Sequence, residues 1–303
     1  MNDYKLTKNQ LNDKLLFKLS QIGFGLNCDL LFTNRINILQ DVELVNNLNY
    51  GDKIFISTAE TNINLDRLVQ ILQKNNIKVY FYLMYEPVID KYIIELLLPV
   101  TIHMFVQNNI YDHEKVHIMP IGIRDCENVV PNHRGFNHNY LLNESLNNVE
   151  KTYLCLLCFS GTHITRNECS TILGNKNFIT NLNDGSYEQQ PSIHCGKVPV
   201  WINYEYTHKS YYALSPRGCG EDTHRFYECI YLDTIPIVKR TNTVFDKLYD
   251  HFPCLVVNDW HEVTEELLLE NKLICIEKIK IFKQKYPNFL TDLDSIMNLL
   301  LQI

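Results

Sequence analysis

The sequence lacks several features that would assign it to a broad class at once. Its longest apolar runs, such as YIIELLLPV, are too short to cross a bilayer, and the polar start, MNDYKLTKNQLNDKLL, contains no signal-peptide core. The formal net charge is -7, which argues against a nucleic-acid partner bound through phosphate neutralisation. Internal repeats and low-complexity segments are also absent. We therefore expect a cytoplasmic globular protein with no transmembrane segment and no nucleic-acid partner.

Metal-binding and disulfide patterns are scarce as well. Cys155 and Cys158 form a CxxC, but no second CxxC and no pair of histidines accompanies it. The ten cysteines are scattered through a chain of 303 residues, whereas disulfide frameworks are typical of short secreted chains. We interpret the cysteines as buried, reduced thiols, and we expect neither a metal nor a cofactor.

The chain does contain a regular alternation of short strands and helices. Its length favours two domains over one. Strands are expected at 52–58, 78–87, 102–109, 115–123, 152–161, 210–216, 234–239 and 253–259, and helices at 65–76, 89–99, 163–173, 222–232 and 244–252. The tail 264–303 is expected to be helical, and 181–197 has no clear pattern. Single helices between strands predict right-handed βαβ units, and therefore an α/β fold with two Rossmann-like parallel sheets.

One segment, SPRGCGEDTHRFYE, follows a predicted strand and begins a predicted helix. Gly218 and Gly220 permit strained dihedrals and a close approach of the backbone to a ligand. Asp222 is expected to cap a helix that begins at Thr223. The N-terminus of that helix would present free N–H groups and a partial positive charge to an anion.

Charged side chains in the same segment match a ligand with phosphate at one end and sugar hydroxyls at the other. Arg217 and Arg225 are forked donors suited to a diphosphate. Glu228, three residues after Arg225, is the natural acceptor for a ribose diol. The alternative is an i, i+3 salt bridge on a solvated helix face, worth roughly a few tenths of a kcal/mol. Each residue alone favours this alternative, but the ordered set favours an anion site.

The segment resembles the nucleotide-sugar signature of exostosin-like glycosyltransferases, which runs approximately S/C-P-R-G-x-G-x-D-S/T-x-R-x-x-E and precedes an apolar strand. The chain matches it at Ser215, Pro216, Arg217, Gly218, Gly220, Asp222, Thr223, Arg225 and Glu228, and then continues with TIPIV. LYDHFPCLVVNDWHEVTEELL downstream is also similar to the family, as are KVHIMPIGIRD and CFSGTHITR upstream. The likeness extends over residues 152–269 and is weaker before them.

The resemblance implies a GT-B fold, with two Rossmann-like domains facing a central cleft. We expect an acceptor-side domain at 1–149, with a linker at 125–149, and a nucleotide-sugar-binding domain at 150–280. A terminal helix at 281–303 would pack back on the first domain. The implied reaction is inverting, metal-independent transfer from a nucleotide sugar, usually a UDP-sugar, to a glycan or glycoconjugate. In such a site arginines and a helix N-terminus stabilise the departing diphosphate in place of a divalent ion.

The resemblance also implies roles for further donor-site residues. Arg166, in GTHITR, stands where such enzymes often place a basic side chain that binds the diphosphate. Ser215 and Thr223 would offer hydroxyl groups to phosphate. His224 occupies a usually small or variable position and would line the cleft.

The catalytic base is expected after a strand of the first domain, where ligand-facing residues of an open α/β sheet belong. Inverting transfer needs a carboxylate or a histidine near the acceptor hydroxyl. Glu86 and Glu60 are the first candidates, Asp125 is the third, and His103 and His163 are further options. Alternatively, these carboxylates cap helices or pair with surface lysines.

Two other functions remain open. A nucleotide-sugar epimerase shares the fold but needs no open acceptor groove. A non-catalytic subunit that binds a nucleotide or a glycan would keep the fold without the chemistry, although an idle site has no reason to retain paired charges. The sequence identifies neither the donor sugar nor the acceptor.

Overall fold

The structure, a computed structural model, describes residues 24, 27–32, 47–57, 64–84, 88–124, 141, 149–161, 163–183, 198–289, 292 and 294–302 of the chain. The chain divides into two compact units. The first comprises Met1–Ile121, Thr243–Phe245 and Leu290–Ile303, and the second comprises Gly122–Asn242 and Asp246–Phe289. The linker expected at 125–149 lies outside the described residues, apart from 141 and 149.

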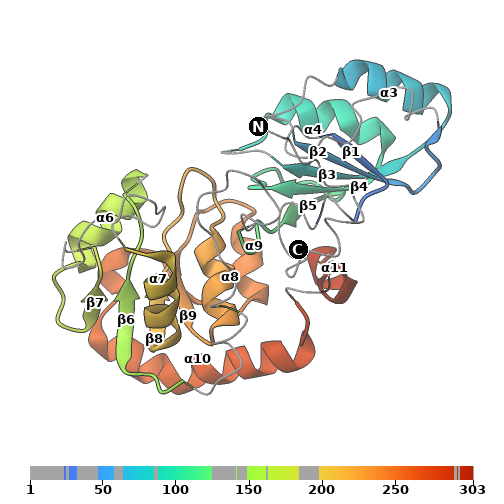
Figure 1. The fold of residues 1–303 in the computed structure, drawn as a ribbon. Helices are drawn as coiled ribbons and strands as arrows, with labels where there is room; N and C mark the ends of the chain where they lie inside the picture. Colours follow the sequence, from blue (N-terminus) through green and yellow to red (C-terminus); the bar gives the residue numbers. More distant parts are fainter. Residues whose placement is uncertain are drawn as a thin grey trace, which may run out of the picture. The chain divides into compact units, whose positions relative to one another are not determined.

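The first unit is built on a parallel sheet of five strands in the order β1-β2-β3-β4-β5 (Figure 1). The strands are β1 (Leu30–Phe32), β2 (Lys53–Ser57), β3 (Val79–Met84), β4 (Thr101–Gln107) and β5 (Val116–Met119). The connections contain α3 (Leu65–Lys74), α4 (Lys91–Leu97) and the 3-10 turn η2 (Leu98–Val100). Spatial neighbours are therefore also neighbours in sequence, as expected for consecutive βαβ units.

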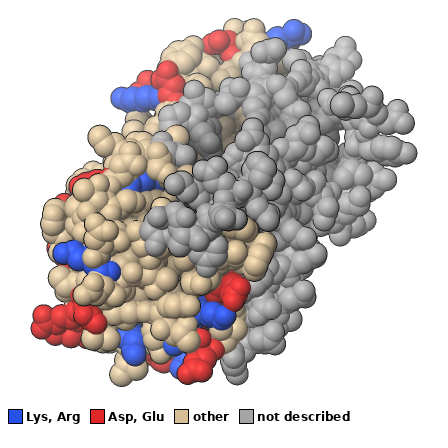
Figure 2. Space-filling view, turned by 60° about the vertical axis from the view of Figure 1, so that its left-hand side comes forward, with Lys and Arg blue, Asp and Glu red and all other residues tan. Residues whose placement is uncertain are grey.

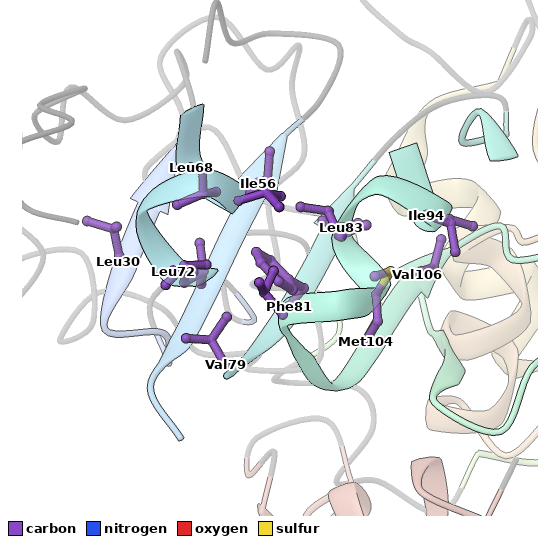
Figure 3. Packing of buried hydrophobic residues seen from close by; sticks show 14 of the residues in the cluster. Leu30, Ile56, Leu68, Leu72, Val79, Phe81, Leu83, Ile94, Met104 and Val106 are labelled. Carbon is purple, nitrogen blue, oxygen red and sulfur yellow. The ribbon is translucent and has the colours of Figure 1, made fainter. Parts of the chain in front are cut away.

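An apolar core fills the space between this sheet and its helices (Figure 3). Leu68 and Leu72, one turn apart on α3, lie in one cluster with Ile56 and Phe81 of the strands, and all four are almost completely buried. Asn64 starts α3, because its side chain accepts a hydrogen bond from the backbone N–H of Arg67 at 2.9 Å. The spacing of the apolar residues thus places one face of the helix on the sheet.

The second unit contains another parallel sheet of five strands, in the order β10-β9-β8-β6-β7. The strands are β6 (Tyr153–Leu157), β7 (Ile179–Asn181), β8 (Ser210–Leu214), β9 (Ile235–Lys239) and β10 (Leu255–Val257). The other elements are α6 (Ile164–Leu173), α7 (Val200–His208), α8 (His224–Tyr231), α9 (Asp246–His251), the 3-10 turn η3 (Trp260–Glu262) and α10 (Glu265–Lys285). The last helix, α11 (Asp294–Leu300), belongs to the first unit and contacts β5. The predicted α/β fold with two parallel sheets is confirmed.

Side chains of β6 and its continuation alternate between two apolar clusters, one on each face of the second sheet. Cys155 and Leu157 pack with side chains of α6 and α10, whereas Leu156 and Cys158 pack with side chains of α7 and α8. Both cysteines are completely buried, and burial raises the pKa of the Cys155 thiol. The two cysteines of the CxxC therefore lie on opposite faces of the sheet and share no site.

Three elements of the described ranges are not predicted from the sequence: β1, β7 and α7. The two strands have only three residues each, which is too short for a pattern to emerge. The helix α7 begins three residues after the segment 181–197 that showed no clear pattern. The strand expected at 115–123 ends at Met119, and the segment that follows leads into the second unit.

Charged side chains of both signs are mixed on the described surface that Figure 2 shows. The longest helix, α10, carries Glu265 and Glu266 in its first turn and Lys283 and Lys285 in its last turn, an arrangement that complements the helix dipole. Among the helices of the described ranges, none has the length and apolar character needed to span a membrane.

Candidate functional site

The strand order of the second sheet reverses between β6 and β8. From β6 the chain forms β7 at one side and then returns to β8 on the other side of β6. In open parallel sheets, ligands bind beyond the carboxyl ends of the strands at such a switch point. The described strands of the first sheet follow sequence order and show no such reversal. The turn after β6 and the loop after β8, residues 215–223, are therefore the candidate ligand-binding segments.

The helix that follows the 215–223 loop begins at His224, one residue later than predicted. Its N-cap is Thr223, whose side chain makes no capping hydrogen bond. The expected cap, Asp222, instead accepts hydrogen bonds from the backbone N–H of Thr223 at 2.7 Å and from the Tyr227 hydroxyl at 2.6 Å. Because these two hydrogen bonds occupy its carboxylate, Asp222 shapes the loop rather than capping the helix. The Thr223 side chain does not accept a hydrogen bond from the first N–H groups of α8 either.

Arg225 and Glu228 are both buried, with 8% and 7% of their surface exposed. The alternative that they form a salt bridge on a solvated helix face is therefore wrong. The expected apolar face of α8, formed by Phe226, Cys229 and Ile230, is buried as predicted, and every residue from Arg225 to Ile230 is buried with it. Two opposite charges thus lie beside the 215–223 loop, away from bulk water.

The ionisation of Glu228 reflects this environment. Burial raises the pKa of its carboxyl group above the ordinary value. The guanidinium groups of Arg225 and Arg124 and a hydrogen bond from the Tyr204 hydroxyl act in the opposite direction. These neighbours therefore offset part of the effect of burial on the pKa of Glu228.

Arg166, in the first turn of α6, joins the turn after β6 to the 215–223 loop. Its Nε donates to the carbonyl oxygen of Arg217 at 3.2 Å, and its Nη1 donates to that of Ser160 at 3.3 Å. A Cβ atom on Gly218 would lie only 2.9 Å from Nη2 of Arg166. Gly218 therefore admits the guanidinium group, which lies against the backbone of the loop.

Neither glycine of the loop adopts an unusual backbone conformation, and Gly218 serves close approach. Among the described glycines, a positive φ occurs at Gly51 and Gly122. Gly218 and Gly220 lie outside that region, so the expected strained dihedrals are not observed. Both residues are buried in the loop.

Arg217 is paired within its own loop. Its Nη1 donates to Oε1 of Glu221, whose side chain is 6% exposed. Arg217 Nε, Glu221 Oε2 and Ser215 Oγ are buried atoms without a hydrogen-bond partner in the part of the chain that the structure describes. Unsatisfied buried groups are rare and cost free energy, so three of them in one loop mark a place where a polar ligand would be stabilised.

His224 connects the first turn of α8 to the segment that enters the second unit. Its Nδ1 lies 2.8 Å from the carbonyl oxygen of Gly122, a residue with φ of 65°. Arg124 follows two residues later and interacts electrostatically with Glu228. His224 is thus engaged with the backbone, and this segment brings an additional positive charge to the site.

The structure describes two of the five candidate bases, His103 and His163. Glu60, Glu86 and Asp125 lie outside the described residues. His103 lies on β4, where its Nδ1 is 2.9 Å from Nε2 of His117 on β5. His163 is the N-cap of α6, and its Nδ1 accepts a hydrogen bond from the backbone N–H of Thr165 at 3.3 Å.

Four residues of the site were not singled out from the sequence: Arg124, Asn203, Tyr204 and Glu221. Asn203 and Tyr204 lie on α7, which was not predicted, and they contact Arg225 and Glu228. Glu221 lies inside the signature at a position that the exostosin pattern leaves variable. Within the described ranges, no group of three or more His, Cys, Asp or Glu side chains is arranged to hold a metal ion.

No protein-family model and no curated protein matches the chain. Among the solved structures that resemble it, a protein from Listeria monocytogenes assigned as a UDP-N-acetylglucosamine 2-epimerase has 10% identity and a TM-score of 0.39, over 92% of this chain and 75% of that one. The S. aureus MnaA–UDP co-structure has 12% identity and a TM-score of 0.37, over 80% and 76%. A further UDP-N-acetylglucosamine 2-epimerase has 11% identity and a TM-score of 0.34, over 94% and 74%. Similarity of this degree supports no inference about the site.

Proposed function

We propose that the chain is a glycosyltransferase that binds a nucleotide sugar, with the diphosphate at the 215–223 loop and the ribose at Glu228. The observation that carries the proposal is the burial of Arg225 and Glu228 beside this loop, at the switch point of the second sheet. Removing two charges from water costs free energy that an exposed salt bridge does not cost. A ligand that is anionic at one end and rich in hydroxyl groups at the other accounts for both charges.

Donors for the diphosphate come from the loop and from the start of α8. The N-terminal N–H groups of α8 receive no cap from the Thr223 side chain, and an anion is stabilised there by the helix dipole. The forked guanidinium of Arg217 would donate hydrogen bonds to a diphosphate, either in addition to its ion pair with Glu221 or in place of that pair. The Ser215 hydroxyl, which has no hydrogen-bond partner among the described residues, is a further donor in this proposal.

Arg166 has a different role in this proposal from the one that the resemblance implies. Two of its nitrogens donate to backbone carbonyl groups, and its third nitrogen lies against Gly218. We therefore assign it to shaping the loop. His224 has a similar role, because its ring is bonded to the Gly122 carbonyl oxygen.

The resemblance of the loop to the exostosin signature supports transfer from a UDP-sugar to a glycan or glycoconjugate, with inversion and without a metal. Guanidinium groups and a helix N-terminus supply the charge that stabilises a departing diphosphate. Glu86, Glu60 and Asp125 remain the predicted bases for the acceptor hydroxyl. Epimerisation of a nucleotide sugar is the alternative reaction, because the loop would hold the same ligand in either case.

Nucleotide binding and product analysis test the proposal. UDP should raise the unfolding temperature in the presence of EDTA, since a ligand at a hundred times its Kd stabilises the folded state by about 2.7 kcal/mol. Incubation with a panel of nucleotide sugars should then release one sugar slowly through transfer to water. A changed sugar still attached to its nucleotide would favour the epimerase. No thermal shift with any nucleotide at millimolar concentration would contradict the nucleotide site.

Variants of the buried pair test the assignment of its two charges. Arg225→Ala and Glu228→Ala should each weaken UDP binding by about tenfold or more, the usual effect of losing a hydrogen bond to a charged group. Lys209→Ala is the control, because it breaks the more exposed i, i+4 pair with Glu205 on α7. If both buried variants bind UDP as tightly as the parent does, the pair is structural and does not contact the nucleotide.

A further inference from the structure

Two buried polar contacts join α7 to α8. The Tyr204 hydroxyl donates to Oε1 of Glu228 at 3.1 Å, and Nη1 of Arg225 donates to Oδ1 of Asn203 at 3.3 Å. Tyr204 and Asn203 are each 1% exposed. Two neighbouring residues of α7 thus hold the two charged groups that the proposed function assigns to the nucleotide. That function alone gives no role to Tyr204 or Asn203.

The Tyr204 hydroxyl favours the ionised form of Glu228. The groups that act on this carboxylate are Arg225 from its own helix, Arg124 from the segment after β5, and Tyr204 from α7. Burial acts against all three. If the hydroxyl were removed, the carboxylate would lose a donor in a desolvated position, and protonation of Glu228 would become more favourable.

The same hydrogen bond restricts the orientation of the carboxylate. An ionised carboxylate can accept about four hydrogen bonds on its two oxygens. Tyr204 uses one of these on Oε1, which limits rotation of the group and leaves acceptor capacity for two adjacent hydroxyls. A protonated Glu228 would have to donate one bond itself and would match a diol less well.

We propose that Tyr204 is a positioning residue of the nucleotide site: it keeps Glu228 ionised and oriented toward the ribose hydroxyls, while Asn203 fixes the guanidinium of Arg225. This inference rests on the proposed function. In this inference Tyr204 acts through Glu228 rather than by touching the substrate. The segment VWINYEYTH therefore determines how well the ribose is recognised, although the family signature does not include it.

A double-mutant cycle with a pH series tests the inference. UDP affinity is measured by calorimetry between pH 5.5 and 8.5 for the parent, Tyr204→Phe, Glu228→Gln and the double variant. Tyr204→Phe should bind UDP about tenfold more weakly near pH 6, as expected for the loss of a hydrogen bond to a charged group, and recover toward pH 8.5. In the Glu228→Gln background, Tyr204→Phe should change the affinity by less than about twofold, because the group it acts through is gone.

Tyr206→Phe is the matched control, because it makes the same change two residues away on α7, where the ring stacks on Tyr153. It should leave the pH profile unchanged. A second comparison uses a UDP analogue without the ribose hydroxyls, for which Tyr204→Phe should cost little affinity.

Each outcome decides between the inference and the proposed function. If the parent binds UDP and Tyr204→Phe keeps the parent's pH profile, the inference is wrong and the proposed function stands. Equal losses from Tyr204→Phe in the parent and in Glu228→Gln mean that Tyr204 acts through packing, which also overturns the inference. If the parent binds no nucleotide, both are wrong. Should Tyr204→Phe not fold, a Glu228→Gln profile identical to that of the parent overturns the inference.

Discussion

Nε of Arg166 donates a hydrogen bond to the carbonyl oxygen of Arg217 at 3.2 Å, across 51 residues of sequence. A second nitrogen of the same guanidinium donates to the carbonyl oxygen of Ser160. The side chain is therefore bonded both to the turn after β6 and to the loop after β8. Gly218 lies directly against it. The conformation of the candidate loop therefore depends on contact between an arginine and a residue without a side chain.

Gly218→Ala should disturb this contact without unfolding the protein. The new Cβ would meet Nη2 of Arg166 at 2.9 Å, and the flexible end of that side chain must move. We expect a loss of about 1 kcal/mol in stability, typical of a tight contact, and about tenfold weaker UDP binding. Thermal unfolding and UDP titration measure the two effects. Cys219→Ala, a change at the neighbouring exposed residue of the same loop that adds no clash with Arg166, is the comparison and should alter both values less than Gly218→Ala does.

Cys219 should be a fast-reacting thiol whose reactivity reports on ligand binding. Of the eight described cysteines, seven are buried and Cys219 is exposed. A maleimide should modify it rapidly, and UDP should slow the reaction if the diphosphate lies at the 215–223 loop. Peptide mapping by mass spectrometry gives the rate at this position. Uridine, which has no phosphate, should protect less; equal rates with and without UDP would argue against a ligand at the loop.

One of Glu86, Glu60 and Asp125 should be needed for transfer but not for donor binding. Removing a general base typically lowers a rate by about 100-fold or more. Glu86→Gln, Glu60→Gln and Asp125→Asn are compared for transfer rate and UDP affinity, with Glu95→Gln at an exposed position of α4 as the control. If all three variants retain the parent's rate, the base must be sought elsewhere, beginning with His103 and His163.

His208 should make the protein less stable in mild acid. The residue is 2% exposed, and burial lowers its pKa from 6.5 to about 4, with a further contribution from nearby Lys151. Lys283 acts in the same direction and Asp233 in the opposite one. Unfolding therefore takes up a proton between pH 6.5 and pH 4, so stability is highest above this window and falls as the pH falls through it. The contribution of this residue should decrease by about 2 kcal/mol between pH 7 and pH 5.

The measurement is the unfolding free energy of the parent and of His208→Gln at several pH values. The variant should show a shallower decrease toward pH 5, whatever its stability at pH 7. His251→Gln, at an exposed position at the end of α9, should keep the slope of the parent. Parallel curves for the parent and His208→Gln would show that His208 takes up no additional proton on unfolding.

Most of the fold could be predicted from the sequence, because apolar runs and helical spacing mark its elements directly. The exception with consequences is α7, whose buried residues follow the helical spacing of 200, 203, 204, 207 and 208. Three of those positions hold Asn203, Thr207 and His208, so a search for apolar periodicity does not detect the helix. Buried polar residues at helical spacing are the signal that would have revealed it.

The candidate site was predicted in part. The order of residues in the 215–223 loop indicates a strand, a turn and a helix start, and the structure has all three. The motif could not predict that Asp222 bonds to Tyr227 instead of capping α8, because the Tyr227 ring is positioned by packing against Phe252, which lies outside the motif. Nor could it predict the contact of Arg166 with Gly218, since contacts between distant segments leave no local pattern.

Two residues that are three positions apart lie on opposite faces in β6 and its continuation, but on neighbouring positions of one surface in α8. In β6 and its continuation this separation places Cys155 and Cys158 on opposite faces of the sheet, so these two thiols cannot approach each other while the sheet is intact. In α8 it places Arg225 and Glu228 on neighbouring positions of one helix surface. An oxidant would find no dithiol to close at the first pair, whereas the proposed nucleotide sugar would contact both members of the second. Whether two residues three positions apart can act on one ligand therefore depends on whether a strand or a helix carries them.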